Sequence, residues 1–155
     1  EDLEFAGIIY IGCMLTKQGP KVIEYNLRLG DPETQVLLPQ LKSDFYQMTS
    51  DLIDHQMPKV EWQEGEFYLG VMVSAPGYPT SPKQHIALPD DLPRNIFYAG
   101  VTEEDGKLYS SGGRIFTLYN HASTLECAQA KVYAELSWLD LSGFYYRKDI
   151  GFRDL

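Results

Sequence analysis

The chain has 155 residues, 44% hydrophobic and 23% charged, which is the composition of a globular protein with enough chain for one domain or two small ones. Its formal net charge of −9 at pH 7 argues against a nucleic-acid binder, because phosphate contacts require clustered Lys and Arg; a small phosphorylated ligand stays compatible. No apolar run approaches the ~18–20 residues of a membrane-spanning helix, so we expect no membrane partner.

The ends and cysteines of the chain indicate a cytoplasmic location. Glu1-Asp2-Leu3-Glu4 lacks the basic start and apolar core of a signal peptide, and the absence of an opening Met is consistent with a fragment. Neither Cys13 nor Cys127 lies in a metal-binding or redox motif. We therefore expect both to be reduced packing residues rather than a disulfide.

The chain begins with a predicted hairpin. The near-continuous apolar run of residues 7–15 is typical of a buried strand, and Gly and Pro mark a turn over residues 16–20. Residues 21–29 return as the second strand. Gly30-Asp31-Pro32 ends that strand, because Pro lacks a backbone donor and restricts the residue before it, which leaves residues 31–35 on a polar loop.

The second strand carries the strongest candidate chemistry. Alternation places Glu24, Asn26 and Arg28 on one face, with Val22 just before them. Carboxylate and amide oxygens suit Mg²⁺, which needs few protein ligands because water and phosphates supply the others, and Arg suits a phosphate. A solvated strand face is the common alternative for such a triplet. The opposite face is expected to pack and carries Ile23, Tyr25, Leu27 and Leu29.

A helix and a domain boundary follow. Residues 36–39 lead back to the core, and Ser43 is the predicted N-cap of a helix, with Asp44 in its first turn. The helix is expected to end by residues 55–58 and to bury an apolar stripe of Phe45, Met48, Leu52 and Ile53. The polar stretch of residues 57–66 predicts a division into domains 1–57 and 58–155.

The second part has the pattern of strands followed by a helix. Strands are predicted at 67–75, 95–99, 107–110 and 114–119, with a rigid loop at 76–82 and a turn at 102–106. Ser123 and Glu126 have the spacing of a capping box, which opens a helix with Leu125, Ala128, Val132 and Leu136 on one side. The aromatic and basic tail, 143–155, is expected to pack on the sheet. The fold class is therefore α+β.

Residues 7–44, which contain E-Y-N-L-R-L-G-D-P-E-T-Q, closely resemble the phosphoribosylamine–glycine ligase family (glycinamide ribonucleotide synthetase), a branch of the ATP-grasp superfamily. The resemblance continues almost to the end of the chain, through P-G-Y-P at residues 76–79, G-G-R at 112–114 and the closing Y-R-K-D-I-G. It implies that residues 1–57 form the end of an ATP-grasp core, an antiparallel hairpin plus a helix. Residues 58–155 would form a small C-terminal domain of antiparallel sheet with a helix.

The resemblance also implies a reaction. ATP would phosphorylate the glycine carboxylate, and the amine of 5-phosphoribosylamine would attack the acyl phosphate to give glycinamide ribonucleotide, a step of purine biosynthesis. By this resemblance Glu24 and Asn26 hold Mg²⁺ or Mn²⁺, and Arg28 is catalytic, facing the transferred phosphate. The glycine and phosphoribosylamine side would be lined by Gly30, Asp31, Pro32 and Glu33.

Two departures from the family pattern shape these expectations. Many ATP-grasp relatives carry a further acidic metal ligand on the preceding strand, whereas residues 7–15 contain no acid. Full-length family members are also much longer, so we expect this chain alone neither to bind ATP tightly nor to turn over, and to expose apolar side chains such as Ile8, Ile9 and Tyr10. The alternatives are another ATP-grasp ligase or carboxylase of nucleotide biosynthesis, and a non-catalytic α+β interaction module.

Overall fold

A computed structural model describes residues 5–152, so the opening residues used to argue against a signal peptide and the last three residues of the predicted tail lie outside the described part. The chain divides into two compact units, Glu1–Glu64 and Gly65–Leu155. The division into domains 1–57 and 58–155 stays a prediction. The fold is α+β, with antiparallel strands and helices, and each unit is described by itself.

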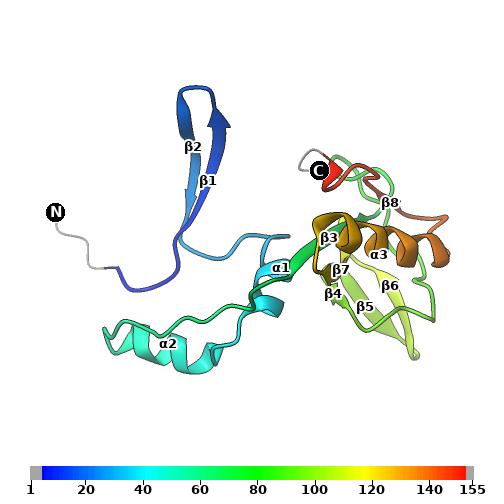
Figure 1. The fold of residues 1–155 in the computed structure, drawn as a ribbon. Coiled ribbons are helices and arrows are strands. Elements are labelled where there is room, and N and C mark those ends of the chain that lie inside the picture. The colour runs from blue at the N-terminus through cyan, green and yellow to red at the C-terminus, as the bar shows by residue number, and fades with distance from the viewer. Residues whose placement is uncertain (1–4, 153–155) are drawn as a thin grey trace. The chain divides into compact units, whose positions relative to one another are not determined.

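Unit 1 begins with the predicted hairpin, formed by β1 (Tyr10–Thr16) and β2 (Gly19–Asn26) in antiparallel pairing (Figure 1). Its strands differ in extent from the prediction, since β1 starts after residue 7 and β2 ends before residue 29. The pairing is irregular at one point: Gly12 faces Glu24 and Cys13 faces Val22, so Ile23 is an extra residue on β2. This β-bulge reverses the alternation of side chains beyond it.

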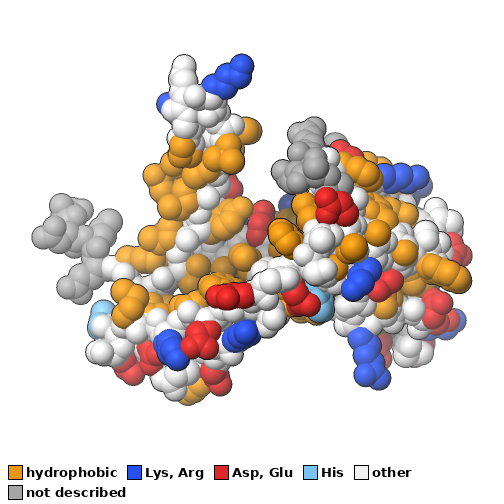
Figure 2. Space-filling model, viewed as in Figure 1, with side chains coloured by type: hydrophobic (Ala, Val, Ile, Leu, Met, Phe, Trp, Pro, Cys, Tyr) orange, Lys and Arg blue, Asp and Glu red, His pale blue; other side chains and the backbone are white. Residues whose placement is uncertain are grey.

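The predicted burial of the hairpin is wrong for the described residues. The side chains of Leu15, Ile23, Tyr25 and Leu27 are 64–84% exposed, and only Leu29 of the expected packed face is half-buried. Figure 2 shows apolar side chains along the length of the hairpin. The pattern identified apolar faces correctly, but β1 and β2 pack mainly on each other, and most of their side chains stay exposed. Ile9 is exposed as expected, whereas Ile8 and Tyr10 are half-buried.

Helices follow the hairpin. The segment 31–35 is not wholly a loop, because α1 (Thr34–Leu37) starts within it and continues into the 3₁₀ turn η1 (Leu38–Gln40). Helix α2 (Phe45–Ile53) ends where expected. Its N-cap is Asp44, which accepts a hydrogen bond from the Gln47 amide at 3.0 Å, and not Ser43. The Ser43 hydroxyl instead accepts from the Glu61 amide at 2.7 Å.

The predicted buried stripe on α2 is also wrong. None of its residues is buried: Phe45 and Ile53 are 44% and 71% exposed, and Met48 and Leu52 are half-buried. The helical spacing gave the correct element, but the described residues of unit 1 provide no core for its apolar face.

Unit 2 contains an antiparallel sheet of four strands in the order β4-β7-β3-β8. These are β3 (Phe67–Ser74), β4 (Ile96–Tyr98), β7 (Arg114–Ala122) and β8 (Tyr145–Tyr146). The short strand β8 pairs with β3, and Tyr146 packs against the core whereas Tyr145 is 62% exposed, so the expected packing of the aromatic tail is confirmed only in part. A separate hairpin joins β5 (Val101–Glu104) to β6 (Lys107–Ser110), so the turn expected at 102–106 is confined to Asp105 and Gly106.

The core of unit 2 lies between β3, β7 and helix α3 (Leu125–Trp138), which crosses the sheet in Figure 1. Thr124 caps α3 by accepting from the Cys127 amide at 3.2 Å, so the prediction of Ser123 as N-cap is wrong by one residue. The predicted face of α3 is confirmed. The fully enclosed side chains include Val71, Val73, Ile115, Phe116, Leu118, Ala128, Val132 and Leu136.

Both cysteines are free thiols, as predicted, but Cys13 and Cys127 are exposed and therefore not packing residues. Cys13 lies on the uncovered hairpin, and Cys127 lies in the first turn of α3, away from the core-facing residues Ala128 and Val132.

The sheet offers a matched pair of phenylalanines that tests this core. Phe116 is fully buried on β7 and Phe67 is 52% exposed on β3. Phe116→Ala is expected to lower the free energy of unfolding by about 3–5 kcal/mol, because it leaves a cavity. Phe67→Ala should cost about 1 kcal/mol. Urea unfolding followed by circular dichroism measures both, and equal effects would contradict the assigned core.

Candidate active site

The polar face of the hairpin is set by the register of its two strands. Asn26 faces Tyr10 and Glu24 faces Gly12, so these four residues point to the same side. Glu24 is exposed and Asn26 is half-buried. The predicted pair of oxygen donors is therefore on one open face. The bulge moves Val22 to the other side, where it faces Cys13, so Val22 does not continue the row as the simple alternation predicted.

Gly12 leaves room for the Glu24 side chain. A Cβ added at Gly12 would lie 3.1 Å from Glu24 Cγ and 3.8 Å from its Oε1. The Glu24 side chain thus lies across the strand at the one position on this face of β1 that has no side chain. The sequence alone did not single out Gly12, because its partner depends on the bulge.

Arg28 is not on the strand. Strand β2 ends at Asn26, and Arg28 is an exposed residue in the bend that follows, where its Nη1 donates to the Leu29 carbonyl at 2.9 Å. The alternation that placed it beside Glu24 does not extend this far. Its catalytic role stays a prediction.

The residues after the strand form a compact turn around Gly30. Gly30 is buried, and its carbonyl accepts hydrogen bonds from the Thr34 amide at 3.0 Å and from the Thr34 hydroxyl. Asp31 is held by the Gln35 side chain, whose Nε2 donates to Asp31 Oδ1 at 2.9 Å. The Glu33 carboxylate folds back over Gly30, at a place that any Cβ on Gly30 would occupy. The four predicted substrate residues, 30–33, thus lie in one turn.

Tyr10 joins this turn to the hairpin face. The negative charge of Glu33, with smaller effects of burial and of Glu24, raises the pKa of Tyr10 above its ordinary value. Tyr10 therefore stays a protonated donor at neutral pH. Sequence reasoning missed this residue; the available signal was a tyrosine on the first strand, opposite the strongest motif.

One buried acceptor in the turn lacks a partner among the described residues. The Oε1 atom of Gln35 is buried without a hydrogen bond, although its Nε2 is satisfied by Asp31. Because an unpaired buried carbonyl is costly, this atom is suited to accept from a donor supplied by a ligand or by another part of the protein.

The side-chain oxygens of Glu24 and Asn26 suit a hard divalent cation that takes most of its ligands from water and substrate phosphates. Within residues 5–152, no group of three or more His, Cys, Asp or Glu could hold a metal ion. Glu24 and Asn26 nevertheless offer two oxygens on an open face, and Mg²⁺ is commonly held by one or two protein groups plus water and substrate phosphates.

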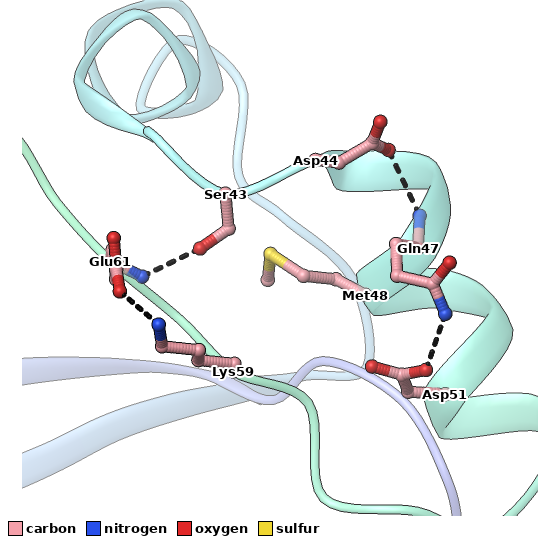
Figure 3. Close-up of a pocket in the computed structure, with 7 residues that line it drawn as sticks. All are labelled: Ser43, Asp44, Gln47, Met48, Asp51, Lys59 and Glu61. Carbon is pink, nitrogen blue, oxygen red and sulfur yellow. Dashed lines mark hydrogen bonds and ion pairs between the residues drawn. The ribbon is translucent and has the colours of Figure 1, made fainter.

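A pocket beside α2 has the wrong chemistry for a phosphate site. It lies between α2 and the segment containing Lys59 and Glu61 (Figure 3). The carboxylates of Asp44 and Asp51 accept hydrogen bonds from Gln47, and the Lys59 ammonium forms an ion pair with Glu61 at 2.6 Å. The hydrogen-bonding groups drawn there bind each other, so the pocket is best described as the contact between α2 and this segment.

Comparison with known proteins gives the family. Residues 68–153 match the family described as "Phosphoribosylglycinamide synthetase, C domain", and residues 1–34 match "Phosphoribosylglycinamide synthetase, ATP-grasp (A) domain". The chain belongs to the phosphoribosylglycinamide synthetase family. The A-domain match contains the whole hairpin and the predicted site residues from Glu24 to Glu33.

Individual relatives support the same family. The chain is 46% identical to the phosphoribosylamine–glycine ligase of Halalkalibacterium halodurans and 44% identical to that of Lactococcus lactis, over 97% and 99% of its length. These alignments cover 36% and 38% of the two ligases, so the chain spans little more than a third of such relatives. A crystal structure of the Thermotoga maritima ligase superposes with a TM-score of 0.77 and 36% identity, over 92% of this chain and 36% of that one.

The helices of the described residues are too short or too polar to cross a membrane. This finding agrees with the sequence, in which no apolar run reaches that length.

The space above Gly12 can be tested directly. In a protein of the relatives' length that contains this sequence, Gly12→Ala is expected to weaken Mn²⁺ binding roughly tenfold, because the new methyl group displaces Glu24. Free Mn²⁺ measured by electron paramagnetic resonance gives the affinity. Cys13→Ala, the next residue and on the other face, is the control; equal losses in both variants, or none in Gly12→Ala, would contradict the assigned geometry.

Proposed function

We propose that this chain is part of an ATP-dependent carbon–nitrogen ligase that joins glycine to 5-phosphoribosylamine and produces glycinamide ribonucleotide in purine biosynthesis. One observation carries the proposal: Glu24 and Asn26 share one open face of the hairpin with Gly12, within the segment that matches an ATP-grasp domain. The names and length of the relatives support the reaction. Two domains, 1–57 and 58–155, and a cytoplasmic location complete the proposal.

The proposed reaction has two steps. The glycine carboxylate attacks the γ-phosphorus of ATP, which gives glycyl phosphate and ADP. The amine of 5-phosphoribosylamine then attacks the glycyl carbonyl carbon, phosphate leaves, and the amine loses a proton, so that an amide is formed. No nucleic acid or membrane is needed as a partner, which agrees with the net charge of −9.

Glu24 and Asn26 are proposed to hold Mg²⁺ or Mn²⁺, which would neutralise charge on the phosphates of ATP. Arg28 is proposed as the catalytic cation that faces the transferred phosphate: its side chain is exposed next to the end of β2, and a guanidinium suits a phosphate. Gly30, Asp31, Pro32 and Glu33 are proposed to line the side of glycine and phosphoribosylamine. The close approach of the Glu33 carboxylate to Gly30, which has no side chain, supports the grouping of these residues in one turn.

Removal of the Glu24 carboxylate tests the function. In the protein of full family length, Glu24→Ala is expected to lower kcat on the order of a thousandfold, because phosphate charge is no longer neutralised in place. Melting temperature should change little, since Glu24 is exposed. Release of ADP with glycine and phosphoribosylamine measures the rate. Glu103→Ala, at an exposed acid on β5, is the control. Full activity of Glu24→Ala would refute the proposal.

The 155-residue chain alone is expected not to bind Mg-ATP with micromolar affinity. Its hairpin contributes metal ligands, but the pocket beside α2 is lined by Asp44, Asp51 and Glu61, and acidic side chains repel phosphates. Titration calorimetry of the chain with Mg-ATP measures this. A micromolar dissociation constant would contradict the expectation.

A further inference from the structure

The last residue of the string G-D-P-E-T-Q, Gln35, has no role in the proposed function, although its side chain spans the turn. It is the second residue of α1, and its Nε2 donates to Asp31 Oδ1 at 2.9 Å, four positions back along the chain. The turn between them is closed by the Thr34 amide, which donates to the Gly30 carbonyl at 3.0 Å. The Gln35 side chain therefore connects the start of α1 to the carboxylate that precedes it.

The two ends of the Gln35 amide lie in contrasting surroundings. Asp31, which accepts from Nε2, is exposed, whereas the Gln35 Oε1 atom is buried and has no hydrogen-bond partner among the described residues. The opposite orientation of the amide would place its oxygen against the Asp31 carboxylate, so that two acceptors would face each other. The pairing therefore fixes the amide with its donor toward Asp31 and its acceptor inward.

The buried acceptor is a cost that an apolar side chain would avoid. Leu or Met at position 35 would fill a similar volume without an unpaired carbonyl, and the hydrogen bond to Asp31 contributes little to stability because its acceptor is open to water. Packing and stability therefore do not account for a glutamine at this position. What the amide alone supplies is a donor that holds the Asp31 carboxylate in one orientation.

One group among the proposed substrates suits an exposed carboxylate. The phosphates of ATP and of phosphoribosylamine are anions, and so is the carboxylate of glycine, so Asp31 repels all three. The ammonium group of glycine is a cation whose N–H groups donate to a carboxylate. A carboxylate that is held in place binds such a group in one defined position, as a reaction at the other end of the same small molecule requires.

We propose that Gln35 is a positioning residue for glycine: its Nε2 holds the exposed Asp31 carboxylate in the orientation in which Asp31 receives the ammonium group of the amino-acid substrate. This inference rests on the proposed function, which supplies glycine as that substrate. An ionised carboxylate has about four lone-pair sites, so the bond from Nε2 is compatible with a bound ammonium group. Gln35 acts through Asp31 and does not touch the reacting atoms.

Gln35→Met in a protein of full family length removes the donor and keeps the approximate volume of the side chain. The KM for glycine is expected to rise roughly tenfold, as for loss of a hydrogen bond to a charged group, while kcat and the KM for ATP change less than about twofold. The melting temperature should not fall, because the variant also removes the buried unpaired acceptor. A merely structural glutamine would show the reverse: a lower melting temperature and an unchanged KM for glycine.

Gln47→Met is the matched control. Gln47 Nε2 donates to Asp51 Oδ1 at 2.7 Å with the same four-residue spacing, but on α2, outside the proposed site. This variant should leave the KM for glycine unchanged. Titration calorimetry of glycine, with Mg²⁺ and a non-hydrolysable ATP analogue present, gives the same comparison without turnover.

A double-mutant cycle with Asp31→Asn tests the route of the effect. If Gln35 acts through Asp31, Gln35→Met causes no further loss of glycine affinity in the Asp31→Asn background. Gln35→Glu is a second variant in case Gln35→Met fails to fold: it keeps the shape of the side chain, offers no donor when ionised, and should also weaken glycine binding roughly tenfold or more.

Two results would overturn the inference even where Glu24→Ala abolishes activity. One is unchanged glycine affinity in whichever Gln35 variant folds, and the other is a loss that adds in full to that of Asp31→Asn. An active Glu24→Ala enzyme would instead overturn the proposed function, and the inference with it.

Discussion

The register between β1 and β2 decides which side chains of this chain can act together. One extra residue, Ile23, separates the pair Gly12–Glu24 from the pair Cys13–Val22. Because side chains alternate along a strand, a shift of one residue in the pairing of β2 with β1 would turn Glu24 and Asn26 away from the face of Gly12 and Tyr10. It would place an apolar side chain on that polar face instead. The bulge therefore fixes Glu24 opposite a glycine and Asn26 opposite Tyr10, and the turn after the strand places the Glu33 carboxylate over Gly30.

Sequence patterns predicted the helices and strands well, but they predicted the burial of side chains in unit 1 poorly. Alternation and helical spacing depend on the chain's own period, so the hairpin, α2 and the strands of unit 2 were predictable. Burial depends on what covers each face. Val71 and Leu118 are enclosed because α3 and the sheet pack together within unit 2, whereas Tyr25 and Ile53 have equally suitable patterns and stay exposed.

Predictions of local detail were wrong where a residue distant in sequence formed a competing hydrogen bond. Ser43 and Asp44 are both good caps, and the choice between them was decided by the Glu61 amide, 18 residues away, which takes the Ser43 hydroxyl. In the candidate site, Glu24 and Asn26 were predictable because they are neighbours on one strand. The positions of Gly12 and Tyr10 on this face and the packing of Glu33 over Gly30 were not predictable, because they depend on the bulge and on the turn after the strand.

The two units differ in how they hold their side chains in place. Unit 2 has an enclosed core of its own, so its strands are held rigid without packing against any further part of the protein. The hairpin of unit 1 has no fully buried apolar side chain among the described residues, and a two-stranded hairpin is marginally stable in water. A metal and phosphate site requires ligands fixed within a fraction of an ångström. Residues 5–152 therefore set the identity and register of the proposed ligands, while a rigid site requires packing on both hairpin faces. Relatives almost three times as long, of which this chain covers 36–38%, have the additional chain for that packing.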